Sequence, residues 1–323
     1  MSKKKKYTRI IGEKFDFDEM IDFIEPEQKY DNDNIPRDIP AEICLKHNQS
    51  GICFGKPTEY VINKYVGMPQ GAEGNSVIIG GTGSSKTVSV AKPTLKTWKG
   101  AMCVTDIKGE LSEHYKQLYL NDDNDEMRPF IIFDPTKSAG AAYDPLWWLI
   151  EDTEENLINN IMDIAYAIIP ETNEYSDPFW TKSERGIFAA ALLYYFGMGL
   201  SFSEILGIIA GQTTTELCNS LNQSTDIRIK ILLGEISSMK PETVASIDRG
   251  LRNKIILFAV DPHISHAFRG VRESADCFTW DDLDEYNIFL RIPEERITQW
   301  SGAINLMYTQ LIRYLERKNK KIS

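Results

Sequence analysis

The sequence has few cysteines, and none of them forms a metal-binding or redox motif. Its five cysteines are scattered over 323 residues without a CxxC pair. This scarcity excludes a disulfide framework and a cysteine-based zinc site, and it is typical of a reduced, cytosolic protein. A basic excess is also lacking, because 47 Asp and Glu outnumber 36 Lys and Arg. Contact with phosphate groups therefore requires a local patch of positive charge.

Long hydrophobic runs are lacking as well. The lysines at the N-terminus precede no apolar segment, so they do not begin a signal peptide. The longest apolar run, residues 187–200, has 14 residues and is too short to span a bilayer. We expect a soluble chain in which this run forms a buried helix. With 42% hydrophobic residues, the chain can form one large domain or two moderate ones.

The spacing of apolar residues predicts an α/β fold. Short β-branched or apolar runs at 76–80, 101–106 and 128–135 alternate with helix-like segments, which indicates a parallel sheet covered on both faces. Strand-like runs return at 254–260 and 286–292, although the first of them could equally continue a helix.

From about residue 150 to 250 the periodicity is helical. Asp177 and Pro178 have the residue types of an N-cap and a first helical position. Ser201 and Glu204 have the spacing of a capping box. A helical block therefore interrupts the α/β part of the chain.

Residues 77–90, VIIGGTGSSKTVSV, resemble a phosphate-binding loop of the pattern G-x-x-x-x-G-K-[ST]. Glycines let backbone N–H groups turn towards phosphate oxygens, the lysine reaches the β- and γ-phosphates, and the threonine hydroxyl ligates Mg²⁺. We expect nucleotide binding by eight consecutive residues, with Mg²⁺ held through the last of them: Gly80, Gly81, Thr82, Gly83, Ser84, Ser85, Lys86 and Thr87.

Ser85 departs from this pattern because it stands where such loops carry glycine. Serine still offers a backbone N–H, and it costs little if its dihedral angles are helical. If the position requires a positive φ, serine strains the loop by roughly 1 kcal/mol. We expect binding to be weakened or unchanged rather than abolished.

A second motif, VTDIKGEL at 104–111, ends the second expected strand. Parallel sheets place their ligand sites at the carboxyl ends of strands, so Asp106 and Lys108 are candidates for the nucleotide site. A charged turn after a strand is the plainer alternative for this motif.

In this order, GGTGSSKT, VTDIKGEL and IIFDP resemble the coupling-protein ATPases of type IV secretion and conjugation, the VirD4/TraG family. DPFWTKSERGIFAAALLYY and NIFLRIPEERITQWSGAINLMYTQLIRYL continue the likeness, which extends over about residues 55–318. The resemblance implies a RecA-like P-loop domain with a parallel sheet and an inserted all-α domain. We assign 1–55 to an acidic arm, 56–146 and 251–323 to the RecA-like domain, and 147–250 to the all-α domain.

The family implies ATP and Mg²⁺ as cofactors and a homo-hexamer as the working assembly. It also implies partners: single-stranded DNA with its relaxase or a secreted protein, together with components of a secretion channel at the cytoplasmic face of the membrane. Residues near 222–240 of the all-α domain are expected to recognise the substrate. The family's N-terminal membrane helices have no counterpart in this sequence, so a membrane partner or a soluble branch is expected.

No run of four apolar residues is followed by Asp-Glu or Asp-Asp, which is the pattern expected for a Walker B acid. Asp134 and Asp261 follow apolar runs, but each precedes proline, and we interpret both as structural turn acids. In the family the Walker B strand follows the helix that ends here at 314–323, so we expect a truncated product that binds ATP and does not hydrolyse it.

Two alternatives remain. One is a non-enzymatic nucleotide-binding or interaction module, such as a decayed remnant. The other is a hexameric DNA translocase related to FtsK or HerA. Five arginines are candidates for a finger acting in trans, and the sequence does not choose among them: Arg249, Arg252, Arg269, Arg272 and Arg291.

Overall fold

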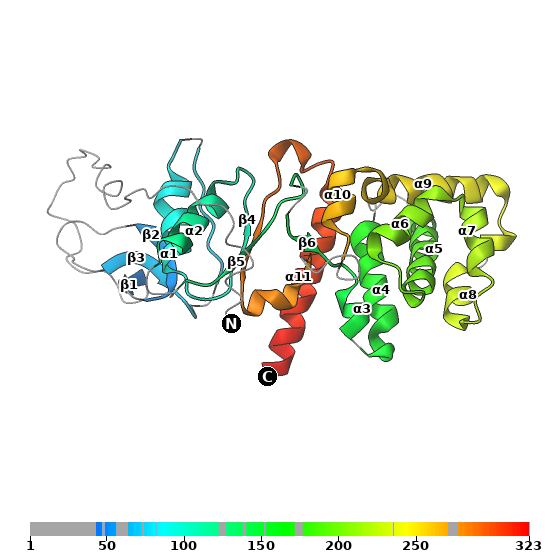
Figure 1. Cartoon of the computed structure of the whole chain (residues 1–323), viewed down its shortest axis with the longest axis horizontal. Coiled ribbons are helices and arrows are strands. Elements are labelled where there is room, and N and C mark those ends of the chain that lie inside the picture. Colours follow the sequence, from blue (N-terminus) through cyan, green and yellow to red (C-terminus); the bar gives the residue numbers. More distant parts are fainter. Residues whose placement is uncertain are drawn as a thin grey trace. The chain divides into compact units, whose positions relative to one another are not determined.

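The computed structural model describes residues 43–46, 49–55, 64–72, 74–81, 83–122, 127–137, 140–151, 153–171, 177–234, 236–270 and 277–322. The chain divides into two compact units, residues 1–100 with 114–129 and residues 101–113 with 130–323. Each unit has its own sheet (Figure 1). Most of the arm expected at 1–55 lies outside the described residues.

The first unit contains a three-stranded antiparallel sheet in the order β1-β3-β2, followed by a helix that packs on it. Its elements are β1 (Cys44–Lys46), β2 (Gly51–Gly55), β3 (Lys64–Pro69), the π-helical segment η5 (Thr87–Ala91) and α1 (Lys92–Thr97). The Cys53 amide donates to Thr94 Oγ1 at 3.1 Å, which ties β2 to α1. The strands β1 and β2 lie in the stretch expected to be an arm, because their apolar runs are short and separated by polar residues.

The second unit contains a parallel sheet in the order β4-β8-β5, formed by β4 (Cys103–Thr105), β8 (Asn287–Leu290) and β5 (Phe130–Phe133). All four residues of the central strand β8 are buried. These strands confirm the expected α/β class and the strand assignments made for 101–106, 128–135 and 286–292. A second, two-stranded parallel sheet pairs β6 (Ala142–Tyr143) with β7 (Cys277–Phe278). The helix α2 (Glu110–Leu120) begins in the second unit and ends in the first.

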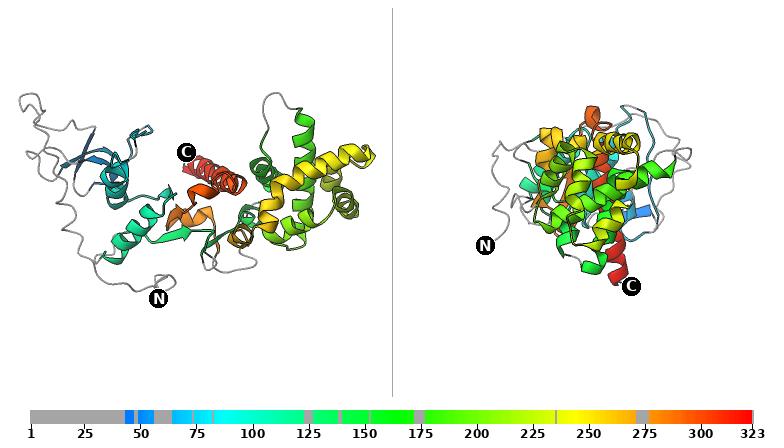
Figure 2. Two further views of the ribbon diagram at one scale, coloured as in Figure 1. Left: turned by 90° about the horizontal axis from the view of Figure 1, so that it is seen from above. Right: turned by 90° about the vertical axis from the view of Figure 1, so that its right-hand side faces the viewer.

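A helical block lies between β6 and β7 in the sequence. It comprises α3 (Trp147–Glu151), α4 (Glu154–Ile168), α5 (Pro178–Gly197), α6 (Phe202–Gly211), α7 (Thr214–Leu221), α8 (Ile227–Leu233), η6 (Ile236–Ser238), α9 (Pro241–Val260) and α10 (Pro262–Ala267). The long helix α9 packs against α5, α6 and α7 (Figure 2). The helix α9 continues past residue 250 and includes residues 254–260. The run at 254–260 is therefore helical, which was the alternative to a strand there.

Local sequence signals in this block place the helix ends. Asp177 accepts the Phe179 amide at 2.9 Å and Pro178 is the first residue of α5, as expected. Ser201 and Glu204 form the expected capping box at α6. Residues 187–193 of α5 are buried, which confirms a buried helix there. In the part of the chain that the structure describes, no helix combines the length and apolarity needed to cross a bilayer.

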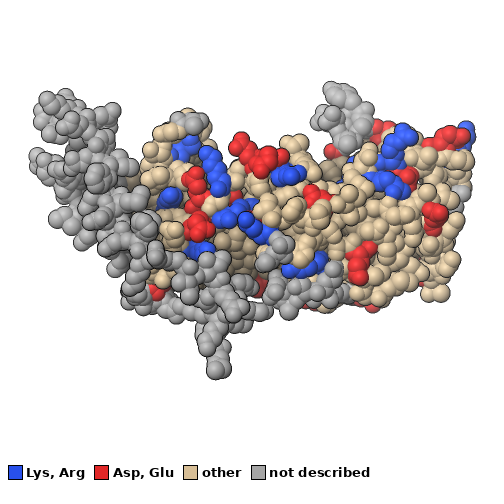
Figure 3. All heavy atoms as spheres, turned by 45° about the horizontal axis from the view of Figure 1, so that its top comes forward, with Lys and Arg blue, Asp and Glu red and all other residues tan. Residues whose placement is uncertain are grey.

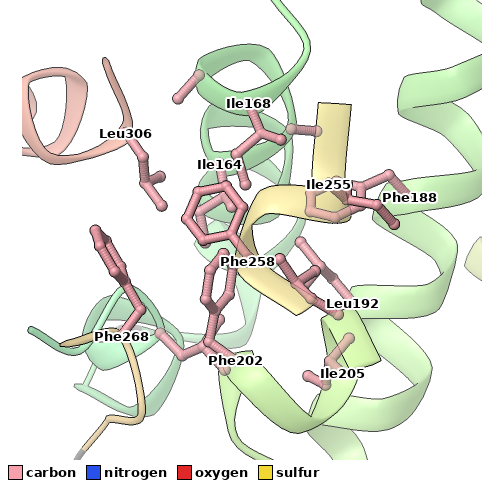
Figure 4. Packing of buried hydrophobic residues seen from close by; sticks show 14 of the residues in the cluster. Ile164, Ile168, Phe188, Leu192, Phe202, Ile205, Ile255, Phe258, Phe268 and Leu306 are labelled. Carbon is pink, nitrogen blue, oxygen red and sulfur yellow. The ribbon is translucent and has the colours of Figure 1, made fainter. Parts of the chain in front are cut away.

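The core of the second unit joins the helical block to the sheet. Phe258 packs edge to face against Phe202 and against Phe268, with ring centroids 5.4 Å apart in each pair (Figure 4). Phe268 also contacts Phe133, the last residue of β5, at 5.7 Å. Because buried aromatic rings contribute much of the apolar area of a core, these contacts fix the helical block to the sheet. The elements that close the unit are η7 (Trp280–Asp284), η8 (Glu294–Arg296) and α11 (Ser301–Ile322).

Candidate functional site

The phosphate-loop segment enters the first unit as an extended stretch rather than as a strand. Residues 75–80 have no strand assignment, and the side chains of Val77 and Ile79 are 81% and 92% exposed. The strand predicted for 76–80 is therefore wrong for this structure. Its β-branched residues favour extended backbone, but the described part of the first unit offers no neighbouring strand for it to pair with.

The loop itself is compact because of two glycines. A Cβ on Gly80 would lie 2.5 Å from Ser84 Oγ, and Gly83 has a φ of +79°, which L side chains rarely adopt. Lys86 Nζ donates to Gly80 O at 2.5 Å, to Gly81 O at 2.9 Å and to Ser84 Oγ at 3.2 Å. The lysine ammonium therefore lies over its own loop, where two carbonyls and one hydroxyl of the loop accept its hydrogen bonds.

Ser85 adopts the strained alternative considered from the sequence. Its φ is +58°, and it is the one residue other than glycine with a positive φ in the described part of the chain. This is the left-handed region, where a side chain costs about 1–2 kcal/mol relative to the right-handed region. The Ser85 carbonyl accepts the Ser89 amide and the Ser89 hydroxyl, both at 2.8 Å, so the helical segment after the loop fixes this residue.

The helix that follows the loop carries local positive charge. Lys92 and Lys96 lie on α1 and, together with burial, lower the pKa of His114 below its ordinary value. Burial is the larger cause, and repulsion from the two ammonium groups adds to it. The first unit thus supplies the local cationic patch that the overall charge of −11 does not reveal. On the face drawn in Figure 3, by contrast, Lys and Arg are interspersed with Asp and Glu.

In the second unit, three charged residues follow the three strands directly. Asp106 follows β4, Asp134 follows β5 and Arg291 follows β8, so all three lie at the carboxyl edge of the sheet. Arg291 Nη2 donates to Ser112 Oγ at 2.7 Å and to Gly109 O at 3.2 Å. Its Nη1 lies 3.6 Å from Asp134 Oδ2.

Asp106 is tied to the same network. Its Oδ2 accepts the Ser112 amide at 2.7 Å and the Ser112 hydroxyl at 2.5 Å, and its side chain is almost fully buried. The carboxylate therefore satisfies an N–H group in the first turn of α2. Lys108, in the turn between them, is exposed. Hydrogen bonds at this edge of the sheet thus hold the backbone of residues 106–112, while Lys108 remains exposed.

The expected site residues belong to two units. Gly80, Gly81 and residues 83–87 lie in the first unit, whereas Asp106 and Lys108 lie in the second. Thr82 lies outside the described residues. Lys86 is hydrogen-bonded to its own loop. Asp106 is hydrogen-bonded to Ser112, which in turn accepts a hydrogen bond from Arg291.

Two acids considered for Walker B have structural partners. Asp134 accepts the amide and the hydroxyl of Thr136, at 3.1 and 2.5 Å. Asp261 caps α10 by accepting the His263 and Ile264 amides, at 2.9 and 3.2 Å. Both carboxylates accept hydrogen bonds from residues that follow closely in the sequence, as acids in turns and helix caps do. This agrees with their interpretation from the sequence as structural turn acids.

The role of Arg291 as an internal tie was not predicted from the sequence. Arg291 was one of five candidates for an arginine finger that acts in trans. Its position directly after an apolar strand was the signal that could have indicated an internal contact at the edge of the sheet. Arg252 is also bound internally, to the carbonyls of Ala210 and Gln212. Arg249 is exposed on α9, and Arg272 lies outside the described residues.

Comparison with known proteins connects this geometry to a family. The conjugal transfer protein TraG of Escherichia coli is 26% identical over 175 residues, which is 49% of this chain and 26% of TraG. The conjugative coupling protein TrwB, in its trigonal form with sulphate, shares the fold with a TM-score of 0.50 and 14% identity, over 72% of this chain and 50% of TrwB. TrwB with a non-hydrolysable ATP analogue superimposes with a TM-score of 0.48 and 14% identity, over 70% of this chain and 48% of TrwB.

The chain thus spans a quarter of the length of TraG and half that of TrwB. The expected fold, a RecA-like P-loop domain with an inserted helical block, is confirmed at the level of this shared architecture. The sequence model of the type IV secretory system proteins for conjugative DNA transfer matches residues 37–323. The chain therefore belongs to this family of conjugative coupling proteins.

Proposed function

We propose that this chain is the nucleotide-binding part of a coupling protein and that ATP with Mg²⁺ binds at residues 80–87. The observation that carries the proposal is Lys86 Nζ, held above the loop carbonyls of Gly80 and Gly81. A ligand phosphate there would meet one ammonium group and the start of a helical segment at Thr87. A Cβ atom placed on Gly81 or on Gly83 would meet no other atom within 4 Å, so the loop leaves room for phosphate oxygens.

In this proposal each residue has a distinct task. Lys86 neutralises the β- and γ-phosphates, and the Thr87 hydroxyl supplies one ligand to the magnesium ion. Bound Mg²⁺ would add further neutralisation of the phosphates. TrwB, a protein of the same fold, has been solved with an ATP analogue and with ADP and Mg²⁺, which supports this choice of ligand. Asp106 and Lys108 remain predictions from the sequence for the nucleotide site.

We propose further that this chain binds ATP without hydrolysing it at a useful rate. Hydrolysis requires a carboxylate that orients water and metal, and Asp134 and Asp261 are both engaged in turns and caps. In the whole protein the energy of hydrolysis would drive DNA with its relaxase, or a protein substrate, into a secretion channel at the membrane. Family membership supports this role, and a homo-hexamer is the assembly that we expect to carry it out.

The proposal is tested by measuring how far bound ATP protects the chain against thermal unfolding. A ligand at 100 times its Kd stabilises the state that binds it by about 2.7 kcal/mol. We expect ATP with Mg²⁺ to raise the Tm of the first unit, ATP with EDTA to raise it less, and Thr87→Ala to remove the difference between the two. Equal protection with Mg²⁺ and with EDTA in the unmodified chain would contradict the role of Thr87.

A further inference from the structure

A groove lies in the helical block of the second unit, where the start of α4, the end of α5 and the start of α8 meet. It encloses about 360 Å³, which is at the lower end of the range of small-molecule pockets. Leu149, Leu157, Leu193 and Phe196 supply its apolar lining. Leu149 and Leu193 are buried, whereas Leu157 and Phe196 are half-buried. The groove therefore has room for a small organic ligand, and its walls suit an apolar side chain.

Charged groups of both signs also line the groove. They are the guanidinium of Arg228 and the carboxylates of Asp226 and Glu154. Asp226, the N-cap residue of α8, holds the arginine from one side. Arg228 Nε donates to Asp226 Oδ1 and Oδ2 at 3.1 and 3.0 Å, and Nη2 donates to Oδ2 at 2.7 Å. This forked contact fixes the position of the guanidinium at the groove.

One nitrogen of the guanidinium is available to a ligand. In the part of the chain that the structure describes, the side-chain hydrogen bonds of Arg228 involve Nε and Nη2, and none involves Nη1. The side chain is 34% exposed, so a molecule in the groove can reach it. Guanidinium groups form strong, charge-assisted hydrogen bonds with carboxylates. Arg228 Nη1 therefore offers a donor to a ligand carboxylate.

Glu154, at the start of α4, supplies the opposite charge. Its Oε1 accepts Arg228 Nη2 at 3.2 Å, and its side chain is 80% exposed. Exposed ion pairs contribute little to stability, and Arg228 keeps its contacts with Asp226 if Glu154 turns away. The carboxylate of Glu154 can therefore bind an ammonium group of a ligand at small cost.

From these contacts we infer that the groove binds a free α-amino acid with an apolar side chain. Its carboxylate accepts a hydrogen bond from Arg228 Nη1, its ammonium group donates to Glu154, and its side chain packs on the leucines of the lining. A carboxylate without the ammonium group would be repelled by two acids, and an amine without the carboxylate would leave Nη1 without an acceptor. The inference goes beyond the proposed function and requires no nucleotide.

The inference is tested by isothermal titration calorimetry of the full chain without nucleotide, with L-leucine as the probe. Three analogues each lack one of the groups that the groove recognises. The compound 3-methylbutylamine lacks the carboxylate, 4-methylpentanoate lacks the ammonium group, and L-alanine lacks the large apolar side chain. We expect L-leucine to bind and each analogue to bind at least about tenfold more weakly, because each loses a charge-assisted hydrogen bond or most of the apolar contact.

Matched variants locate the site. Glu154→Gln and Glu242→Gln remove the same charge at two exposed positions of the helical block, but only the first lies at the groove. We expect Glu154→Gln to weaken binding of L-leucine at least about tenfold and Glu242→Gln to weaken it less than about twofold. Glu154→Gln should not weaken binding of 4-methylpentanoate, because this analogue has no ammonium group to lose. A general loss of structure in the variant would weaken both ligands alike.

Three results would overturn the inference: no binding of L-leucine by the folded chain, an analogue that binds as tightly as L-leucine, or equal effects of the two glutamine variants. The analogue series uses the unmodified chain, so it decides even if a variant does not fold. ATP binding at residues 80–87 is measured separately with Lys86 variants. Failure at the groove therefore leaves the nucleotide proposal untouched, and the reverse also holds.

Discussion

Gly250 of α9 faces Glu184 of α5 so closely that a methyl group on the glycine would overlap Glu184 Oε1. Glu184 is 4% exposed and pairs with Lys254, one turn further along α9. The missing side chain at 250 therefore makes room for a buried carboxylate where the two helices cross. This contact connects the helix of the apolar run to the helix that returns the chain to the sheet.

Gly250→Ala should consequently destabilise the second unit. Overpacking of this kind costs about 1–3 kcal/mol. The added methyl group would displace the buried Glu184 carboxylate, which is paired with Lys254. Gly207→Ala is the matched control, because Gly207 lies in the exposed part of α6, where an added Cβ would meet no atom within 4 Å. There alanine should stabilise by about 0.5–1 kcal/mol through its higher helix propensity. Urea unfolding measures both, and equal effects of the two substitutions would contradict the packing argument.

Arg291→Ala should destabilise the second unit by about 2 kcal/mol, because it leaves the nearly buried carboxylate of Asp134 without its cation. Arg291→Lys should recover only part of this loss, since an ammonium cannot bond Ser112 and Gly109 in the fork geometry of a guanidinium. Arg296→Ala, at an exposed position, should change stability by less than about 0.5 kcal/mol. A lysine variant as stable as the unmodified chain would show that the fork is unimportant.

Ser85→Gly and Ser85→Val test the strained loop. Glycine adopts a φ of +58° without a Cβ penalty, and the folded loop already has this φ, so Ser85→Gly should stabilise the first unit by about 1 kcal/mol in urea unfolding and change ATP affinity by less than about twofold. A β-branched residue is a severe outlier at this φ, and Ser85→Val should lower affinity at least about tenfold. Isothermal titration calorimetry measures both affinities. If valine binds ATP as well as serine does, the positive φ is not required for binding.

The stability of the first unit should fall as the solution is acidified below the ordinary pKa of histidine. Burial and the two lysines lower the pKa of His114 in the folded state below 6.5. The unfolded state therefore takes up the proton first, so the stability present above about pH 6.5 is lost as the pH falls towards the folded pKa. His114→Gln should remove this component, whereas His263→Gln, at an exposed position, should keep it. Urea unfolding between about pH 5.5 and 7.5 measures the pH dependence of stability in both variants. An identical pH dependence in the two would contradict the contribution of His114.

The sequence predicted those parts of the fold that depend on local signals. Asp177, Ser201 and Glu204 act at helix ends as expected, since capping needs only neighbours in the sequence. The strands at 103–105, 130–133 and 287–290 were predicted because buried parallel strands are continuously apolar. The strand at 76–80 was not correctly predicted, because an apolar run forms a strand only where a partner strand is present.

The candidate site was predictable in its residue types but not in its contacts. The pattern identified Lys86 and the glycines, and it raised the question of the φ of Ser85 without answering it. The link from Arg291 to Ser112 joins residues 179 positions apart, and no local signal specifies such a pair. Asp106 stays a prediction for the nucleotide site, and its carboxylate also accepts the Ser112 amide in the first turn of α2, a contact that the sequence did not predict.

The most direct test of the account is equilibrium binding of a fluorescent ATP analogue in the presence of Mg²⁺. Lys86→Ala removes the ammonium above the loop, and loss of such charge-assisted hydrogen bonds costs about 1.5–3 kcal/mol. We therefore predict binding by the unmodified chain and by Lys96→Ala, and at least about tenfold weaker binding by Lys86→Ala. No binding by the folded, unmodified chain, or binding that Lys86→Ala leaves unchanged, would contradict the central claim that residues 80–87 form a working nucleotide site.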